Sequence, residues 1–315
     1  MTHGDGTLFG PSALGPPMAI VEWIRASQAI LFEASIVPAF VGTYAAVSAG
    51  APFNAIWFGL ILVSLVAIQA GANLFKGYYE AQDRAAPPSS AGSWFAFDSG
   101  AAASLARSPR TVLHVGYVVF GVGVLAGLVL VVVTANLVLL AFGVAGAALA
   151  WSYSSPPLKL SYRGIGEIST FLAFGPVMTV GATVVFGGAG LTRSIGASIV
   201  LGFLAAAISF ARYFPNREED RAKGKRTPVT ILGERRATKV FDGLFLAPFP
   251  IGVALLFLRG GIVWMIVLVL VAAPVLLAFH LGAKLPRLYE FAIALTIASH
   301  LFVGFGLILD FAFGL

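Results

Sequence analysis

The sequence predicts an all-α membrane protein, a bundle of nine transmembrane helices. Three observations predict this fold class: 58% of the 315 residues are hydrophobic, only 11% are charged, and the mean hydropathy is +0.91. Soluble domains contain about 25% charged residues, so most of this chain is expected in lipid. The sequence has no cysteine, which excludes disulfides, Cys-ligated zinc, iron–sulfur clusters and thiol nucleophiles.

Nine apolar stretches come close to the roughly 20 residues that a bilayer core requires. The predicted spans are residues 28–49, 55–76, 111–134, 136–154, 168–189, 194–214, 242–258, 261–282 and 289–313. The third and fourth meet at Thr134, Ala135 and Asn136, which predicts a tight helical hairpin. Residues 1–18 lack a basic segment followed by an apolar one, so we expect a mobile tail rather than a cleaved signal peptide, and residues 19–315 form a single transmembrane domain.

The basic residues fall almost entirely in the N-terminal segment and in the loops that follow even-numbered spans. Only Arg193 and Arg259 fall on the other side. Because Lys and Arg collect in cytoplasmic loops, we expect a multi-pass protein of the cell membrane with a cytoplasmic N-terminus and a C-terminus outside. The net charge of +6 then belongs to one face and favours contact with anionic membrane lipid. It does not indicate nucleic-acid binding, which would require a basic soluble domain.

Two polar segments, residues 73–83 and 212–227, each follow an apolar span where a helix should reach water. On a helix of 3.6 residues per turn, two polar stripes result. The first contains Asn73, Gly77, Glu80 and Arg84, with Lys76 and Asp83 at its edge; the second contains Arg212, Asn216, Glu219 and Lys223, with Asp220 beside it. If these stripes face each other, their oxygen atoms could hold Mg²⁺, which bridges carboxylates to substrate phosphates and offsets the charge of a departing pyrophosphate.

Simpler interpretations compete with this one. The first stripe fits a helix end with a snorkelling lysine and a Glu80–Arg84 pair at i,i+4, and the second fits a solvated charged loop. Inside the spans, Glu33 is expected to bind an acceptor hydroxyl or a neighbouring helix, and interhelical hydrogen bonds are favoured for His280 and His300. The loop of residues 85–107 is either a lid over a cavity or a docking arm.

Several segments resemble a known family. They are residues 23–27 (WIRAS), 37–42 (VPAFVG), 108–112 (SPRTV), 155–167 (SPPLKLSYRGIGE), 174–181 (FGPVMTVG) and 220–227 (DRAKGKRT). In these segments the chain resembles the UbiA superfamily of intramembrane prenyltransferases, and within it the branch that prenylates 1,4-dihydroxy-2-naphthoate. The resemblance implies nine helices around a lipid-facing cavity, capped by two acidic loops. Aspartates in NDxxDxxxD and DxxxD motifs would hold Mg²⁺ on a prenyl pyrophosphate, whose ionisation gives an allylic cation that an aromatic acceptor attacks.

Together, the polar stripes and the resemblance predict the site residues. Catalytic roles fall on Asn73, Glu80 and Asp220. The predicted metal ligands are Asn73, Glu80, Asp83, Asn216, Glu219 and Asp220. The predicted substrate-binding residues are Gln69, Lys76, Arg84, Lys159, Arg163, Arg212, Lys225 and Arg226.

The aspartate motifs of this chain depart from the family pattern. Lys76 and Gly77 stand where the first motif begins with Asn-Asp, Glu80 and Arg84 replace its later aspartates, and Asn216 replaces the first aspartate of the second motif. Each added positive charge competes with a dication for the same carboxylates. Three arrangements remain open: a shifted site at Asn73, Glu80 and Asp83; one ion at Asn216, Glu219 and Asp220; or phosphate bound directly by Lys76 and Arg84.

The interpretation that covers most of these features is a prenyl transferase acting on a prenyl pyrophosphate and an aromatic, naphthoate-type acceptor. Two alternatives stay open. One is a catalytically silent relative that binds quinone, lipid or pigment as a subunit of a larger membrane complex, and the other is a UbiA-type terpene cyclase.

Overall fold

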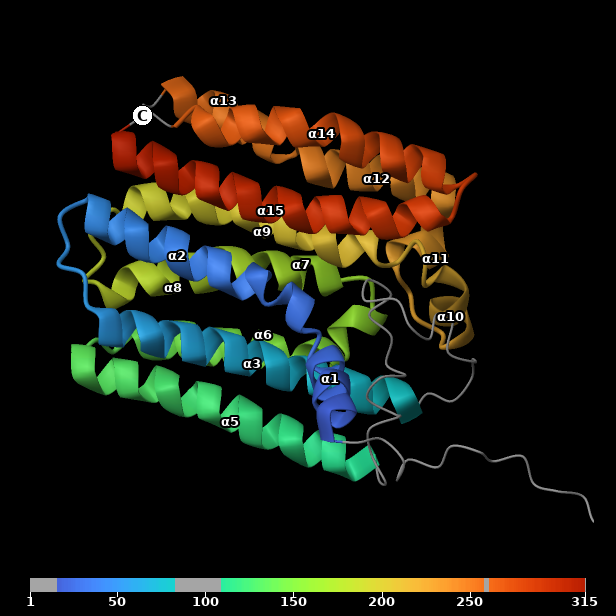
Figure 1. Ribbon diagram of the computed structural model, residues 1–315, viewed down its shortest axis with the longest axis horizontal. Helices are drawn as coiled ribbons and strands as arrows, with labels where there is room; N and C mark the ends of the chain where they lie inside the picture. Colours follow the sequence, from blue (N-terminus) through green and yellow to red (C-terminus); the bar gives the residue numbers. More distant parts are fainter. Residues whose placement is uncertain (1–15, 83–108, 258–260, 315) are drawn as a thin grey trace, which may run out of the picture.

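The computed structural model describes residues 16–82, 109–257 and 261–314, and every regular element in these ranges is a helix. The long helices run side by side (Figure 1). In chain order the elements are α1 (Pro16–Ala26), η1 (Ala29–Leu31), α2 (Glu33–Ser48), α3 (Ala55–Gln82), α5 (Pro109–Thr134), α6 (Val138–Ser154), η2 (Leu160–Tyr162), α7 (Gly166–Leu172), η3 (Ala173–Val177), α8 (Met178–Val185), α9 (Leu191–Ala211), α10 (Arg217–Ala222), α11 (Pro228–Leu232), α12 (Glu234–Leu246), α13 (Pro248–Phe257), α14 (Val263–Gly282) and α15 (Arg287–Phe313). The predicted all-α fold class is confirmed.

Seven helical segments of the described chain are long and apolar enough to cross a bilayer, and they correspond to seven of the nine predicted spans. The predicted fourth span is α6, which is shorter at 17 residues. The predicted seventh span, residues 242–258, consists of the end of α12 and all of α13. The two helices are separate because Pro248 has no backbone N–H with which α12 could continue. The count of nine spans therefore stays a prediction.

Glycines allow the helices to approach closely. A Cβ on Gly42 of α2 would lie 2.0 Å from the backbone oxygen of Thr179 in α8, and the Gly42 oxygen accepts a hydrogen bond of 2.8 Å from Thr183. Gly123 of α5 lies in the same way against the backbone of Ser64 and Ile68 in α3. Small residues at such crossings are the usual means of packing membrane helices, because lipid gives no hydrophobic drive for association.

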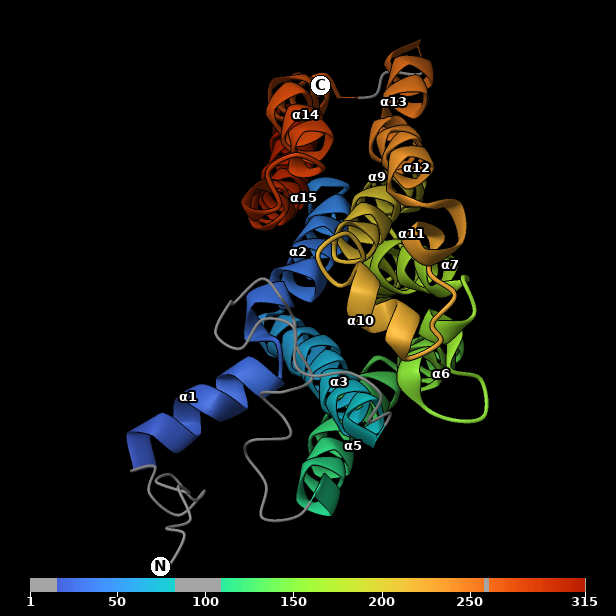
Figure 2. The same ribbon diagram turned by 90° about the vertical axis from the view of Figure 1, so that its right-hand side faces the viewer.

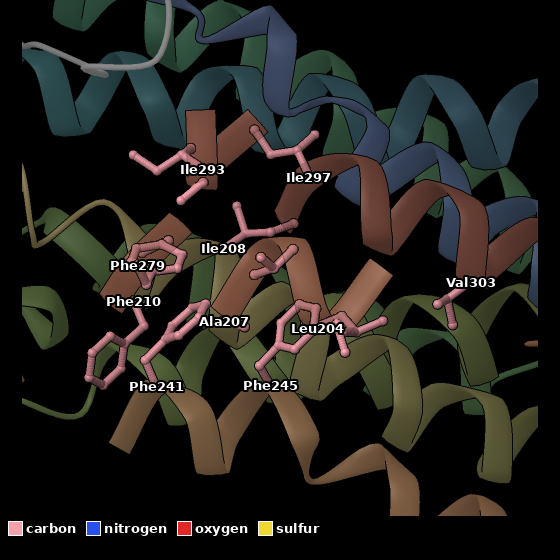
Figure 3. Close-up of a cluster of buried hydrophobic side chains, with 14 of the residues drawn as sticks. Leu204, Ala207, Ile208, Phe210, Phe241, Phe245, Phe279, Ile293, Ile297 and Val303 are labelled. Carbon is pink, nitrogen blue, oxygen red and sulfur yellow. The ribbon is translucent and has the colours of Figure 1, made fainter. Parts of the chain in front are cut away.

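An aromatic core lies between α9, α12, α14 and α15 (Figure 3). Phe241 of α12 is fully buried, and its ring centroid lies 4.1 Å from that of Phe279 in α14. Two histidines form hydrogen bonds to neighbouring helices. His300 Nδ1 lies 2.8 Å from Glu33 Oε2, and His280 Nε2 lies 3.0 Å from Asp242 Oδ2. Both histidines thus have the helix partners expected of them, and Glu33 has a helix partner as well.

The two polar segments lie at one end of the bundle, which we call the polar end. The C-terminal ends of α3 and α9 reach it together with α10 and α11 (Figure 1), and a view onto this end shows α10 beside the end of α3 (Figure 2). At the same end, α1 extends sideways from the bundle and exposes Ile20, Val21 and Ile24. The predicted tail, residues 1–18, lies mostly outside the described residues.

We expect Gly42→Ala to lower the stability of the bundle, because the added methyl group must push α2 away from α8; overpacking of this kind costs about 1–3 kcal/mol. Gly59→Ala in α3 is the matched control. No atom lies within 4 Å of its added Cβ, and alanine in a helix interior is about 0.5–1 kcal/mol better than glycine. Thermal unfolding of the detergent-solubilised protein measures both, and equal midpoints for the two variants would contradict the close approach.

Candidate functional site

An apolar cavity of about 280 Å³ opens among α3, α5, α6, the α7–α8 segment and α9. Its lining extends along α6 from Leu139 to Tyr153, which is about 20 Å at 1.5 Å per residue. Apolar side chains form most of the wall, and some of the polar lining residues, among them Asn73, Tyr153 and Arg212, lie toward the polar end. The Tyr153 hydroxyl lies 3.1 Å from Ser209 Oγ, which also lines the cavity. The cavity can therefore hold a long apolar chain with its polar group near Arg212.

One face of α3 leads from this cavity to the polar end. Gln69, Asn73, Lys76 and Glu80 recur at intervals of three or four residues, so they share that face. Gln69 and Asn73 line the cavity, whereas Lys76 and Glu80 lie beyond it. Lys76 is partly buried and lies within electrostatic reach of Glu80, Arg212, Asp220 and Lys225. Of the residues predicted for the stripe on α3, Asn73, Lys76 and Glu80 therefore lie on one face of the helix.

Gln69 and Asn73 also bind backbone between α1 and α2. Gln69 Nε2 donates to the Leu31 oxygen over 2.8 Å, Gln69 Oε1 accepts from Ser35 over 2.6 Å, and Asn73 Nδ2 donates to the Ser27 oxygen over 2.9 Å. The carbonyl groups at Ser27 and Leu31 flank Gln28, whose φ of 55° interrupts the helix. Both side chains thus have a structural role that the sequence did not reveal.

The turn after α10 brings Lys225 back against Asp220, an earlier residue of that helix. Gly224 has a φ of 68°, the Lys225 N–H donates to the Asp220 oxygen over 2.8 Å, and the Gly224 N–H donates to the Arg221 oxygen over 3.1 Å. This pair of bonds is the Schellman motif, which ends many helices at a glycine and brings the residue after it back onto the last turn. In most such motifs that contact is apolar, but here it joins Lys225 to Asp220.

Lys225 also joins this turn to α3. Its Nζ lies 2.6 Å from Glu80 Oε1 and 3.2 Å from Asp220 Oδ1, and the three side chains are 9%, 5% and 6% exposed. Burial by itself lowers the pKa of Lys225, but the Glu80 and Asp220 carboxylates outweigh it and hold that pKa above its usual range. Burial raises the pKa of Asp220, and the nearby Lys225 only partly offsets this effect. The ammonium is therefore charged at every physiological pH.

We call Lys76, Glu80, Asp220 and Lys225 the buried cluster. Several of the other predicted residues lie near it. Glu219 pairs with Lys223. Lys159 and Lys225 lie 4.8 and 4.9 Å from the centre of the Tyr162 ring. Asn216 is the N-cap residue of α10.

Arg163 and Arg226 are exposed, and Arg163 donates to the Pro157 oxygen over 2.9 Å. Asp83 and Arg84 lie outside the described residues. The roles assigned to all of these side chains stay predictions.

The profile of the UbiA prenyltransferase family matches residues 35–288 of the chain. The chain belongs to this family. UbiA relatives include the 1,4-dihydroxy-2-naphthoate octaprenyltransferases of Mycobacterium tuberculosis, 27% identical over 82% of this chain and 85% of the relative, and of Bacillus subtilis, 25% identical over 75% and 74%. The 2-carboxy-1,4-naphthoquinone phytyltransferase of Arabidopsis thaliana is 28% identical over 71% of this chain and 58% of the relative.

Solved UbiA structures share the fold. A homologue from Aeropyrum pernix K1 superposes with a TM-score of 0.64 at 18% identity, covering 89% of this chain and 97% of that one. A homologue from Archaeoglobus fulgidus, bound to DMAPP and Mg²⁺, gives a TM-score of 0.64 at 15% identity, covering 91% and 99%. With its seven long apolar helices, this UbiA chain is a multi-pass membrane protein.

The Mg²⁺ bound by that homologue raises the question of whether the described residues of this chain fit such an ion. No three His, Asp or Glu side chains lie together among residues 16–82, 109–257 and 261–314 in a group that could hold a metal. The two predicted ligands that do meet, Glu80 and Asp220, share the Lys225 ammonium between them. Asp220 Oδ2 is buried without a hydrogen-bond partner in the described chain, and one such oxygen is far from the octahedral set that Mg²⁺ demands. These residues do not fit the ion.

A double-mutant cycle tests the ion pair between α3 and the α10 turn. We expect Lys225→Met to cost about 3–5 kcal/mol, because it leaves buried carboxylates without a cation. Glu80→Gln in the same protein should recover at least about 1 kcal/mol of that loss, because contacting residues are coupled. The exposed Arg221–Glu218 pair of α10 is the control, with a coupling of about 0.5 kcal/mol or less. Equal coupling in both cycles, measured by reversible unfolding, would contradict the buried pair.

Proposed function

We propose that this protein transfers a prenyl group from a prenyl diphosphate to an aromatic acceptor of the naphthoate class within the membrane. One observation carries the proposal: an apolar cavity about 20 Å long ends at Arg212, next to the buried cluster that contains Lys76 and Lys225. This arrangement suits a molecule with a long apolar chain and a strongly anionic head. The names of the relatives from M. tuberculosis, B. subtilis and A. thaliana support the acceptor class.

In this proposal the diphosphate is held by Lys76, Arg212 and Lys225. Breaking the bond between the prenyl carbon and the diphosphate oxygen leaves the electron pair on the oxygen. The basic side chains stabilise that developing negative charge, and they are most effective because they are already in place in a site of low dielectric constant. The two carboxylates of the cluster hold Lys225 in position.

The other product of ionisation is an allylic cation, which the cavity must keep from water. Its lining of leucine, valine, isoleucine and alanine side chains offers few polar groups to bind water, and exclusion of water prevents hydrolysis of the reactive intermediate. A ring carbon of the acceptor then forms a bond to the prenyl carbon. That ring carbon releases the group it carried, either a proton, which the departing diphosphate can accept, or a carboxylate, which leaves as carbon dioxide. The diphosphate then leaves the site.

The acceptor is proposed to bind at the Tyr153–Ser209 pair. Both hydroxyl groups line the cavity within reach of each other, and both lie toward the same end as Arg212. A hydroxyl can donate one hydrogen bond and accept others, so the pair can bind the hydroxyl or carboxyl substituents of an aromatic ring. In this orientation the ring lies beside the prenyl carbon that is bonded to the diphosphate. The polar end is proposed to be cytoplasmic, because the basic loops gather there.

The proposal is tested by incubating the purified protein with a labelled prenyl diphosphate and 1,4-dihydroxy-2-naphthoate, and following both diphosphate release and prenylated product. Release that requires the acceptor and is matched by product supports transfer. Release without acceptor would instead indicate cyclisation of the prenyl chain. No release with prenyl chains of any length would contradict the enzymatic assignment and favour a protein that only binds lipid or quinone.

Ala147→Phe should restrict the length of the prenyl chain, because Ala147 of α6 lines the middle of the cavity. We expect kcat/KM for long prenyl diphosphates to fall at least about tenfold, a loss of 1.4 kcal/mol of transition-state binding, while dimethylallyl diphosphate is affected far less. Ala145→Phe is the matched control, since Ala145 is exposed on the same helix and is not part of the lining. An equal loss of kcat/KM for short and long prenyl diphosphates would place the prenyl chain outside this cavity.

A further inference from the structure

We propose that Lys225 takes the place of a bound divalent ion in this chain, so that the diphosphate binds to Lys76, Arg212 and Lys225 without an ion bridged by Glu80 and Asp220. The inference rests on the proposed function, because it concerns the same head group. It adds a statement about divalent ions: the protein should bind its diphosphate substrate when these ions are removed from the solution.

The Lys225 ammonium occupies the position that a bridging ion would need. Lys225 Nζ lies between the two carboxylates, 2.6 Å from Glu80 Oε1 and 3.2 Å from Asp220 Oδ1. A Mg²⁺ ion that bridged the same oxygens would need about 2.1 Å to each of them, so the lysine would have to leave first. An ion that entered this position would have to displace a buried cation that already pairs with both carboxylates. The lysine therefore competes strongly with an ion for this position.

The backbone also fixes Lys225 in this position. The Schellman bond from the Lys225 N–H to the Asp220 oxygen holds one side of the residue, and Thr230 Oγ1 donates to the Lys225 oxygen over 2.8 Å on the other. The Tyr162 ring lies 4.9 Å from Nζ, which is within the range of a cation–π contact. A surface lysine would lose side-chain entropy when it bound a phosphate, but this one is already ordered.

Basic side chains already match the carboxylates at this site. Among the described residues, Lys76, Arg212 and Lys225 face the two carboxylates of the cluster, and Glu167 is a third carboxylate near Arg212. A site that recruits dications instead has an excess of carboxylates, which attract the metal before the metal attracts the phosphate. The basic side chains here can attract an anion directly.

The hydrogen-bonding capacity of Lys225 supports the same conclusion. An ammonium has three N–H donors, and Glu80 and Asp220 accept two of them. The third can donate to a phosphate oxygen, and charge-assisted hydrogen bonds of this kind are about twice as strong as neutral ones. Lysine is thus able to connect the two carboxylates to an anion, which is the same connection that a bridging metal makes.

The direct test measures binding of geranyl S-thiolodiphosphate, which resists ionisation, to the full-length protein in lipid nanodiscs. We expect the dissociation constants in excess EDTA and in excess Mg²⁺ to agree within about threefold. Weakening by about a hundredfold or more in EDTA would overturn the inference and leave the proposed function standing. An absence of binding in both buffers would overturn both.

A second test uses a variant for which direct binding by Lys225 and binding through a metal ion predict opposite changes in affinity. Asp220→Asn removes a negative charge that only positions Lys225, so in EDTA the thiolodiphosphate should bind as tightly as to the unmodified protein or more tightly. If Asp220 were a metal ligand, the same variant would weaken binding in Mg²⁺ at least about tenfold. Glu218→Gln is the matched control, because it removes one negative charge from the same helix at a side chain that is 72% exposed.

Electron paramagnetic resonance of Mn²⁺ gives a reading that does not depend on the diphosphate. The unmodified protein should bind no Mn²⁺ at this cluster, whereas Lys225→Met should gain a Mn²⁺ site at Glu80 and Asp220. Lys239→Met, an exposed lysine of α12, is the control and should gain none. Tight Mn²⁺ binding to the unmodified protein that Asp220→Asn abolishes would overturn the inference. If Lys225→Met does not fold, the measurements on the unmodified protein and on Asp220→Asn still decide the question.

Discussion

The buried contact of Lys225 with Glu80 and Asp220 is the constraint on which the polar end depends. Glu80 and Lys225 are 145 residues apart in the sequence, so their contact fixes the end of α3 against the turn after α10. Separating them would leave charges in an environment that solvates them poorly, which costs about 3–5 kcal/mol. The contact between the end of α3 and the α10 turn is therefore electrostatic, whereas the close helix crossings at Gly42 and Gly123 depend on packing.

Helix α9 shows how packing and the cavity are combined. One side of α9, including Leu204, Ala207 and Phe210, packs into the aromatic core with Phe241 and Phe279 (Figure 3). Another side, with Ala205, Ser209 and Arg212, lines the cavity. Because the core is close-packed and resists deformation, it fixes α9 from behind, and the small residues on the cavity side leave the space open. Arg212 is the C-cap residue of α9 and follows directly after Ala211, so the rigid helix also positions Arg212, which is the arrangement a binding site requires.

The sequence predicted much of the fold and part of the site. Hydropathy identified the long helices, and the loop residues identified the family, because both signals are local. Residues 73–83 and 212–227 were expected to converge, and Glu80 and Asp220 do meet. The partner that lies between them was not predicted, since the proposed replacements for a metal were Lys76 and Arg84. Gly224 is a readable signal for a helix end, but which carboxylates its neighbour Lys225 would contact depends on packing between segments far apart in the chain. The backbone bonds of Gln69 and Asn73 were missed for the same reason.

A lysine and a divalent ion solve the same electrostatic problem differently. The lysine has one positive charge instead of two, and it contacts phosphate oxygens through N–H groups rather than by coordination, so it stabilises a departing diphosphate less per contact. It is, however, covalently attached, so no equilibrium of binding from solution limits its presence. The remaining stabilisation must come from Lys76 and Arg212 and from the low dielectric constant of the buried site, where each charge acts more strongly than in water. A site of this kind favours donors whose cation is itself well stabilised, and allylic prenyl diphosphates have that property because their positive charge is shared between two carbon atoms.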